Sequence, residues 1–82
     1  MQNQEEYLLV MSGCPDVEVA KKLANKILDQ KLAACVNIVP QVISVYEWEG
    51  QREQSDECLL VMKTMQGQYE ALQDFIVQGA SL

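Results

Sequence analysis

A long β-rich stretch near the middle of the chain constrains the fold most. Residues 34–48 are rich in β-branched and aromatic side chains, and only Pro40 interrupts them. A strand of about 15 residues reaches roughly 50 Å, whereas a compact chain of this size is only about 30 Å across. Because proline cannot donate a ladder hydrogen bond, we expect Pro40 to lie at an edge or a bulge. The strand must therefore bend sharply or protrude from the body.

Two further strands are predicted around this stretch. Residues 7–11 form a short apolar run that residues 12–15 close with turn-forming side chains. A glycine turn at residues 49–51 follows the long strand, and the apolar run at residues 58–62 returns as its hairpin partner.

Two helices are predicted from apolar residues spaced three and four apart. The first begins with Pro15 in its opening turn, and Asp16 and Glu18 place negative charge at the positive end of its dipole. The second has helical spacing from about residue 68 to residue 77, and Gly79 ends the pattern. The order β-α-β-β-α predicts an α+β, ferredoxin-like antiparallel sheet with two helices on one face and the final strand missing.

The chain of 82 residues predicts one domain, residues 1–82, that is marginal as a lone monomer. A protruding hairpin would expose apolar side chains near its tip, among them Val45, Tyr46 and Trp48. We therefore expect copies of the chain to cover one another. The alternative is that the hairpin folds back onto its own helices.

Composition narrows the classes of partner. A net charge of −6 without a basic cluster excludes nucleic acid as an expected partner. The polar, acidic start and the absence of a long apolar run predict no signal peptide and no membrane insertion. Three widely spaced cysteines do not suggest a disulfide framework, which favours the reducing cytoplasm.

The sequence contains no histidine, so it lacks the commonest general base and the commonest metal ligand. An acylphosphatase-like hydrolase would need an arginine after the first strand, yet residues 12–15 carry no positive charge. We expect that the protein is not an enzyme.

Two cysteines are candidate metal ligands. Cys14 stands where copper chaperones carry the first cysteine of a Cys-x-x-Cys loop, but Val17 replaces the second. The alternative for Cys14 is an ordinary loop residue. The second candidate is Cys35, for which the alternative is packing as a small hydrophobe on a strand. Cys58 is expected to pack in the same way.

Several blocks of sequence resemble the CutA divalent-cation tolerance family. These are KLAACVNIVP at residues 31–40, SVYEWEG at residues 44–50 and LLVMKT at residues 59–64, in the family's order and spacing. The resemblance covers residues 7 to about 75. It implies a homotrimer of ferredoxin-like subunits whose long hairpins associate, a role in copper tolerance, and no established reaction. It also implies that this chain is truncated at its C-terminus, which would leave the first strand unpaired on one side and lower the stability.

The resemblance also implies that residues of this chain line clefts between the subunits of the trimer. Its intersubunit cleft candidates are Asn37, Tyr46, Glu57 and Lys63. Independently of the resemblance, the apolar hairpin tip makes Val45, Tyr46 and Trp48 the oligomer-interface candidates, because a large aromatic such as Trp48 suits an interface anchor. The alternative is ordinary cross-strand pairing and packing.

Two functions stay open at this point. The first is a trimeric cation-tolerance or metal-binding protein, for which copper or another divalent cation is the candidate ligand and no cofactor is required. The second is a metal-independent regulatory or scaffolding trimer that binds a small ligand or an unidentified protein partner at the intersubunit clefts.

Overall fold

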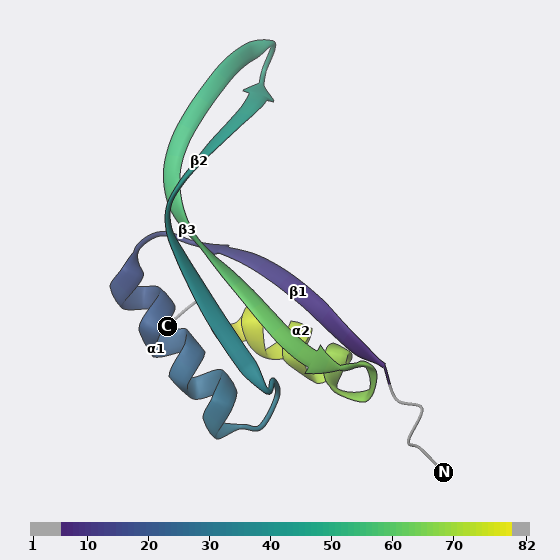
Figure 1. Cartoon of the computed structure of the whole chain (residues 1–82). Helices are drawn as coiled ribbons and strands as arrows, with labels where there is room; N and C mark the ends of the chain where they lie inside the picture. Colours follow the sequence, from purple (N-terminus) through teal and green to yellow (C-terminus); the bar gives the residue numbers. More distant parts are fainter. Residues whose placement is uncertain (1–5, 80–82) are drawn as a thin grey trace.

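The structure is a computed structural model and describes residues 6–79. It is a three-stranded antiparallel sheet with two helices packed on one face, which confirms the predicted α+β, ferredoxin-like arrangement (Figure 1). The elements are β1 (Tyr7–Cys14), α1 (Val17–Asp29), β2 (Cys35–Trp48), β3 (Gln51–Met65), the 3-10 turn η1 (Gln66–Gln68) and α2 (Tyr69–Gly79). The strand order is β1-β3-β2, so β3 is central.

Helix α1 begins slightly later than the sequence predicted. Asp16 is the N-cap, and its carboxylate accepts a hydrogen bond from the Val19 amide at 2.9 Å. Pro15 therefore precedes the cap instead of lying in the first turn, which corrects that prediction. The cap satisfies one of the amides that a helix N-terminus leaves without an intrahelical partner.

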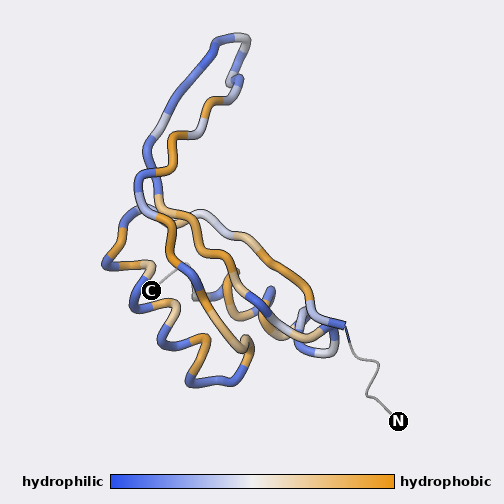
Figure 2. The backbone as a smooth tube through the Cα atoms, viewed as in Figure 1, coloured by the Kyte–Doolittle hydropathy of each residue, from blue (hydrophilic) through white to orange (hydrophobic). Residues whose placement is uncertain are grey.

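The core lies between the helices and one face of the sheet. Leu60 and Met62 of β3 are fully buried and pack in one cluster with Leu23 and Ile27 of α1 and Leu72 of α2. Side chains alternate along β3, so every second residue points into this cluster and the residues between them point to the other face. Figure 2 shows apolar colouring along the strands of the body and in patches along β2 into the arm, whereas the β3 side of the arm is hydrophilic.

Strands β2 and β3 continue well past the end of β1. The last pair between β1 and β3 is Cys14 with Cys58, whereas β2 pairs with β3 as far as Trp48 with Gln51. The two-stranded part, residues 42–57, is called the arm here, and it projects from the body in Figure 1. It gives the chain extents of 53 × 24 × 20 Å and a radius of gyration of 14.5 Å, against about 12 Å for a compact chain of this length. The hairpin therefore does not fold back onto its own helices.

A β-bulge lies where the arm leaves the body, as Pro40 predicted. The register shifts between Val39 and Val42, and Gln41 within the bulge has a φ of 60°. At the tip, Glu49 and Gly50 have φ values of 52° and 79°, the signature of a two-residue type I′ turn. This turn matches the twist of the two strands, so it closes a long ribbon without splaying it.

Strand β1 lies at one edge of the sheet and is longer than predicted, because it extends to Cys14. Within residues 6–79 it pairs only with β3, so its outer edge has no strand partner there. Neither helix in this part of the chain has the length and apolar character needed to span a bilayer.

Candidate functional site

The face of the sheet opposite the helices is largely apolar and exposed. In β1, Tyr7 is 61% exposed, Leu9 66% and Met11 65%. The register places these three beside Met65, Lys63 and Val61 of β3. We call this surface the open face, and its members are Tyr7, Leu9 and Met11 of β1, Leu59, Val61, Lys63 and Met65 of β3, and Cys35, Asn37 and Val39 of β2. Soluble monomers rarely leave a contiguous apolar surface of this kind uncovered.

The bulge carries the open face onto the arm. Before it, the odd-numbered residues of β2 lie on the open face; after it, the extra residue shifts the alternation, so the even-numbered ones do. Tyr46 and Trp48 therefore lie on the same side of the ribbon as the open face, with 45% and 62% of their surfaces exposed. Ile43 and Val45 lie on the reverse side of the arm and are 61% and 58% exposed.

All four predicted cleft residues lie on the open-face side of the ribbon. Lys63 stands between Leu9 and Cys35 in one row across the three strands. Asn37 lies beside Val61, Glu57 lies opposite Val42 at the base of the arm, and Tyr46 lies opposite Glu53 farther out. They share a side but spread along it, so a single chain does not gather them into one pocket. Of the predicted interface residues, Tyr46 and Trp48 face this side, whereas Val45 faces the other.

Glu57 lies where the arm leaves the body and makes one hydrogen bond across the arm. Its carboxylate accepts a short hydrogen bond from the Ser44 hydroxyl on the neighbouring strand. The other carboxylate oxygen lies against Gly13 near the end of β1. The side chain thus contacts β1 and β2 at once, where the three-stranded sheet becomes the two-stranded arm.

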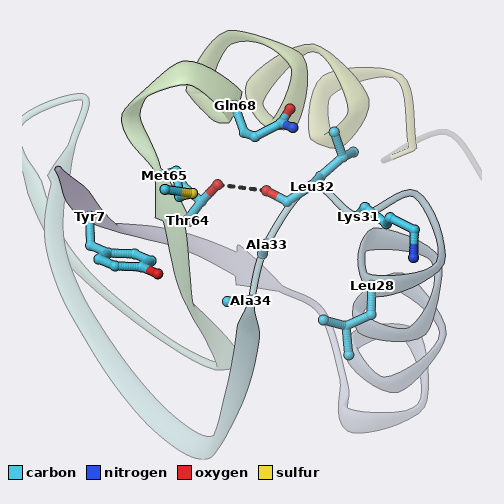
Figure 3. A pocket seen from close by; sticks show the side chains of 9 residues that line it. All are labelled: Tyr7, Leu28, Lys31, Leu32, Ala33, Ala34, Thr64, Met65 and Gln68. Atoms are coloured by element: carbon cyan, nitrogen blue, oxygen red, sulfur yellow. Dashed lines mark hydrogen bonds between the residues drawn. The ribbon is translucent and has the colours of Figure 1, made fainter. Parts of the chain in front are cut away.

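A cavity of about 360 Å³ lies at the opposite end of the sheet (Figure 3). Its lining residues are Tyr7, Leu28, Lys31, Leu32, Ala33, Ala34, Thr64, Met65 and Gln68. Thr64 is 1% exposed and donates a 2.6 Å hydrogen bond from its hydroxyl to the Leu32 carbonyl, which holds the loop after α1 against β3. The sequence reasoning missed this site, because its lining comes from β1, the end of α1, β3 and two connections that only the fold brings together.

The two predicted cysteine ligands do not share a site. Cys35 is exposed on the open face, and its thiol lies 4.0 Å from the Asn37 amide oxygen on the same strand. Cys14 is buried on the helix-covered face. Residues 6–79 contain no cluster of three or more cysteine and acidic side chains that could hold a metal ion.

Cys14 instead faces Cys58, whose pairing the sequence reasoning missed. The two residues are direct partners across β1 and β3, and both are buried in the core cluster. Burial raises the pKa of the Cys14 thiol above its ordinary value, with further contributions from Cys58 and Asp16. The missed signal was the register: aligning the first strand with the returning strand places the two cysteines opposite each other.

Comparison with known proteins agrees with this geometry. The family model described as "CutA1 divalent ion tolerance protein" matches residues 8–81. The chain is 49% identical over 69 residues to the chloroplastic protein CutA of Arabidopsis thaliana, covering 84% of this chain and 38% of that protein. It is 44% identical over 63 residues to human protein CutA, covering 77% and 35%. The chain thus spans little more than a third of the length of these two relatives.

Solved structures give the same result. The crystal structure of CutA1 from Oryza sativa matches with a TM-score of 0.85 at 41% identity, covering 89% of this chain and 67% of that one. The divalent cation tolerance protein (Cut A1) from Thermus thermophilus matches with a TM-score of 0.84 at 34% identity, covering 90% and 72%. The β-α-β-β-α order, the protruding arm and these matches lead to one conclusion: the chain belongs to the CutA1 divalent ion tolerance family.

Proposed function

We propose that this chain acts in divalent-cation tolerance as a homotrimer, with copper as the cation. The observation that supports assembly is the open face together with its continuation along the arm. A single copy leaves Leu9, Met11 and Trp48 each more than three-fifths exposed. Burying apolar surface stabilises by about 25 cal/mol per Å², so a partner surface that covers these side chains gains substantially.

The arm adds a second reason for assembly. Beyond the pair Cys14 with Cys58, residues 42–57 form only two strands, so both outer edges carry backbone groups without a ladder partner in the described chain. Strand edges of this kind pair readily with another chain. A closed cyclic trimer would let each arm reach a neighbour while each open face turns inward, and closure leaves no surface available for open-ended growth.

The role we propose is one of binding and not of catalysis, and it is carried out in the cytoplasm. Three free cysteines suit a reducing compartment, where thiols persist as metal ligands. Copper suits the chain better than a hard cation because thiolate sulfur prefers soft metals.

A second candidate is a metal-independent trimer that binds a small ligand or a protein partner. The cavity beside Thr64 supports it, because about 360 Å³ is within the size range of small-molecule sites. The two candidates differ in their response to chelators. A chelator would remove the metal from a metal-binding protein and abolish its activity in tolerance, whereas it would leave the binding of a small ligand in the cavity unchanged.

Light scattering on the full chain tests assembly. A trimer has a mass of about 28 kDa, three times the chain mass of 9.3 kDa. A uniform 9.3 kDa species at micromolar concentration would contradict the assembly. Copper tolerance is tested separately by growing cells that express the chain in rising copper concentrations, beside cells that express the assembly-defective variant described in the Discussion. Equal growth of both cultures would contradict a role for the trimer in tolerance.

A further inference from the structure

Two buried cysteines of one chain, Cys14 at the end of β1 and Cys58 on β3, form a pair. Cys14 is 5% exposed and Cys58 is 3% exposed, and the register places them directly opposite each other. Both belong to the core cluster on the helix-covered face, so both side chains point to the same side of the sheet. Two thiols are thus held beside each other on adjacent strands.

The hydrogen-bond pattern indicates how far apart the two residues are. The Gln66 amide donates to the Glu6 carbonyl at 2.8 Å, which makes the row of Glu6 and Gln66 a hydrogen-bonded pair. Bonded and non-bonded rows alternate along an antiparallel register, and Cys14 with Cys58 falls on a bonded row. Such pairs have Cα atoms about 5.5 Å apart, and their Cβ atoms lie toward the wider end of about 4.5–5.5 Å.

This spacing disfavours a direct bond between the sulfurs. A disulfide needs Cβ atoms about 3.5–4.5 Å apart, so the two side chains would have to shift toward each other, although a Cα spacing of about 5.5 Å lies within the disulfide range. An ion placed between the sulfurs adds a bridging atom and accommodates the wider spacing. Cu(I) fits because soft thiolate ligands select it and two of them complete a linear site.

We propose that Cys14 and Cys58 together bind one Cu(I) ion through their two thiolate sulfurs. Binding forms two copper–sulfur bonds and releases the two thiol protons to solvent. It involves no change of oxidation state, because copper arrives and stays as Cu(I). The surrounding apolar cluster, including Leu60 and Leu72, keeps water from the sulfurs.

Both ligands come from one chain, so the site does not require the trimer. Its biological use rests on the proposed role in copper tolerance, but its existence does not. An experiment can therefore disprove Cu(I) binding without disproving assembly, and the reverse. A monomeric variant with charges on the open face keeps the copper site, and a trimer that lacks either cysteine loses it.

The test is a Cu(I) titration of the reduced full chain without oxygen, in competition with the chromophoric chelator bicinchoninic acid. We expect one ion per chain. Losing a residue that only supports a metal ligand lowers metal affinity about 10–100-fold. Cys14→Ala and Cys58→Ala each remove a ligand itself, so each should weaken Cu(I) binding by more than that. Cys35→Ala is the matched control, because it removes the exposed thiol and should leave affinity unchanged.

Two outcomes would overturn the proposal. The first is affinity that survives both core substitutions or disappears with Cys35→Ala, which would assign the copper to the exposed thiol. The second comes from X-ray absorption on the loaded wild-type chain, which does not depend on how the variants fold. Two sulfur neighbours support the site, whereas one sulfur, or a shell of oxygen and nitrogen, excludes it.

Discussion

One carboxylate oxygen of Glu57 lies 2.7 Å from the position that a Cβ atom on Gly13 would occupy. The other end of the same carboxylate group holds the Ser44 hydroxyl. Glycine at position 13 thus leaves the space that the Glu57 carboxylate occupies when it accepts the hydrogen bond from Ser44.

Replacing Gly13 with alanine should therefore disturb the hydrogen bond between Ser44 and Glu57. The new methyl group displaces the Glu57 carboxylate from Ser44, and loss of a hydrogen bond to a charged group costs about 1.5–3 kcal/mol. We expect Gly13→Ala to lower the free energy of urea unfolding by less than about 1 kcal/mol, because the Glu57 carboxylate ends a flexible side chain and regains water when it moves away at this partly exposed site. In a Glu57→Ala background the same substitution should cost much less. Equal costs in both backgrounds would show that the two residues are not coupled.

Thr64 should contribute to stability through its hydroxyl. Thr64→Val keeps the shape of the side chain but leaves the Leu32 carbonyl without its 2.6 Å donor in a buried setting. We expect a loss of about 1–3 kcal/mol in the free energy of unfolding. Thr64→Ser retains the hydroxyl but removes a buried methyl group, which by itself costs about 1 kcal/mol. A Thr64→Val variant as stable as the wild type would show that the bond contributes nothing.

Charge on the open face should prevent assembly. The double variant Leu9→Lys with Met11→Lys would place two ammonium groups where apolar surface is to be buried, at a cost of several kcal/mol. We expect light scattering to show the mass of one chain, 9.3 kDa, with helical content retained by circular dichroism. Val77→Lys on α2 is the matched control, because Val77 is 69% exposed and lies outside the open face. Dissociation by Val77→Lys, or a trimer that tolerates the double substitution, would place the interface elsewhere.

A substitution at the tip of the arm should make the protein more stable. Glu49 has a φ of 52°, a conformation that costs a residue with a side chain about 1–2 kcal/mol and suits asparagine better. We expect Glu49→Asn to raise the free energy of unfolding by about 0.5 kcal/mol. Gly50→Ala, at a φ of 79°, should lower it by about 1 kcal/mol although nothing lies within 4 Å of the new methyl group. A destabilised Glu49→Asn variant would contradict the type I′ assignment.

The raised pKa of Cys14 should make stability fall in alkaline solution. Burial disfavours the thiolate, so the folded chain keeps this proton to a higher pH than the unfolded chain, whose thiol titrates near 9.0. The contribution is complete below that pH and is lost as the pH rises through the folded pKa. Lysine and tyrosine titrate in the same region, so the measurement is the difference between wild type and Cys14→Ala in urea unfolding from pH about 8 to about 10. That difference should fall across this range, and a constant difference would contradict the shift.

Local structure could be predicted from the amino-acid order alone. The apolar spacing of α1, the acidic residues at its N-terminus and the β-branched residues of β2 are short-range properties, because each depends on neighbours within one or two turns or along one strand. Pro40 marked the bulge for the same reason, since a residue without an amide hydrogen cannot continue a ladder. The family resemblance was likewise carried by contiguous blocks of residues.

The folded arrangement was needed to establish which distant residues face each other. The bulge at Pro40 shifts the alternation of β2, and this shift places Tyr46 with Asn37 on one side and leaves Val45 on the other. The register between β1 and β3 brings Cys14 to Cys58, whereas the two cysteines considered as ligands from sequence, Cys14 and Cys35, end up on opposite faces. The physical reason is that strand pairing joins residues far apart in the chain, and a shift of one residue moves a side chain to the other face of the sheet.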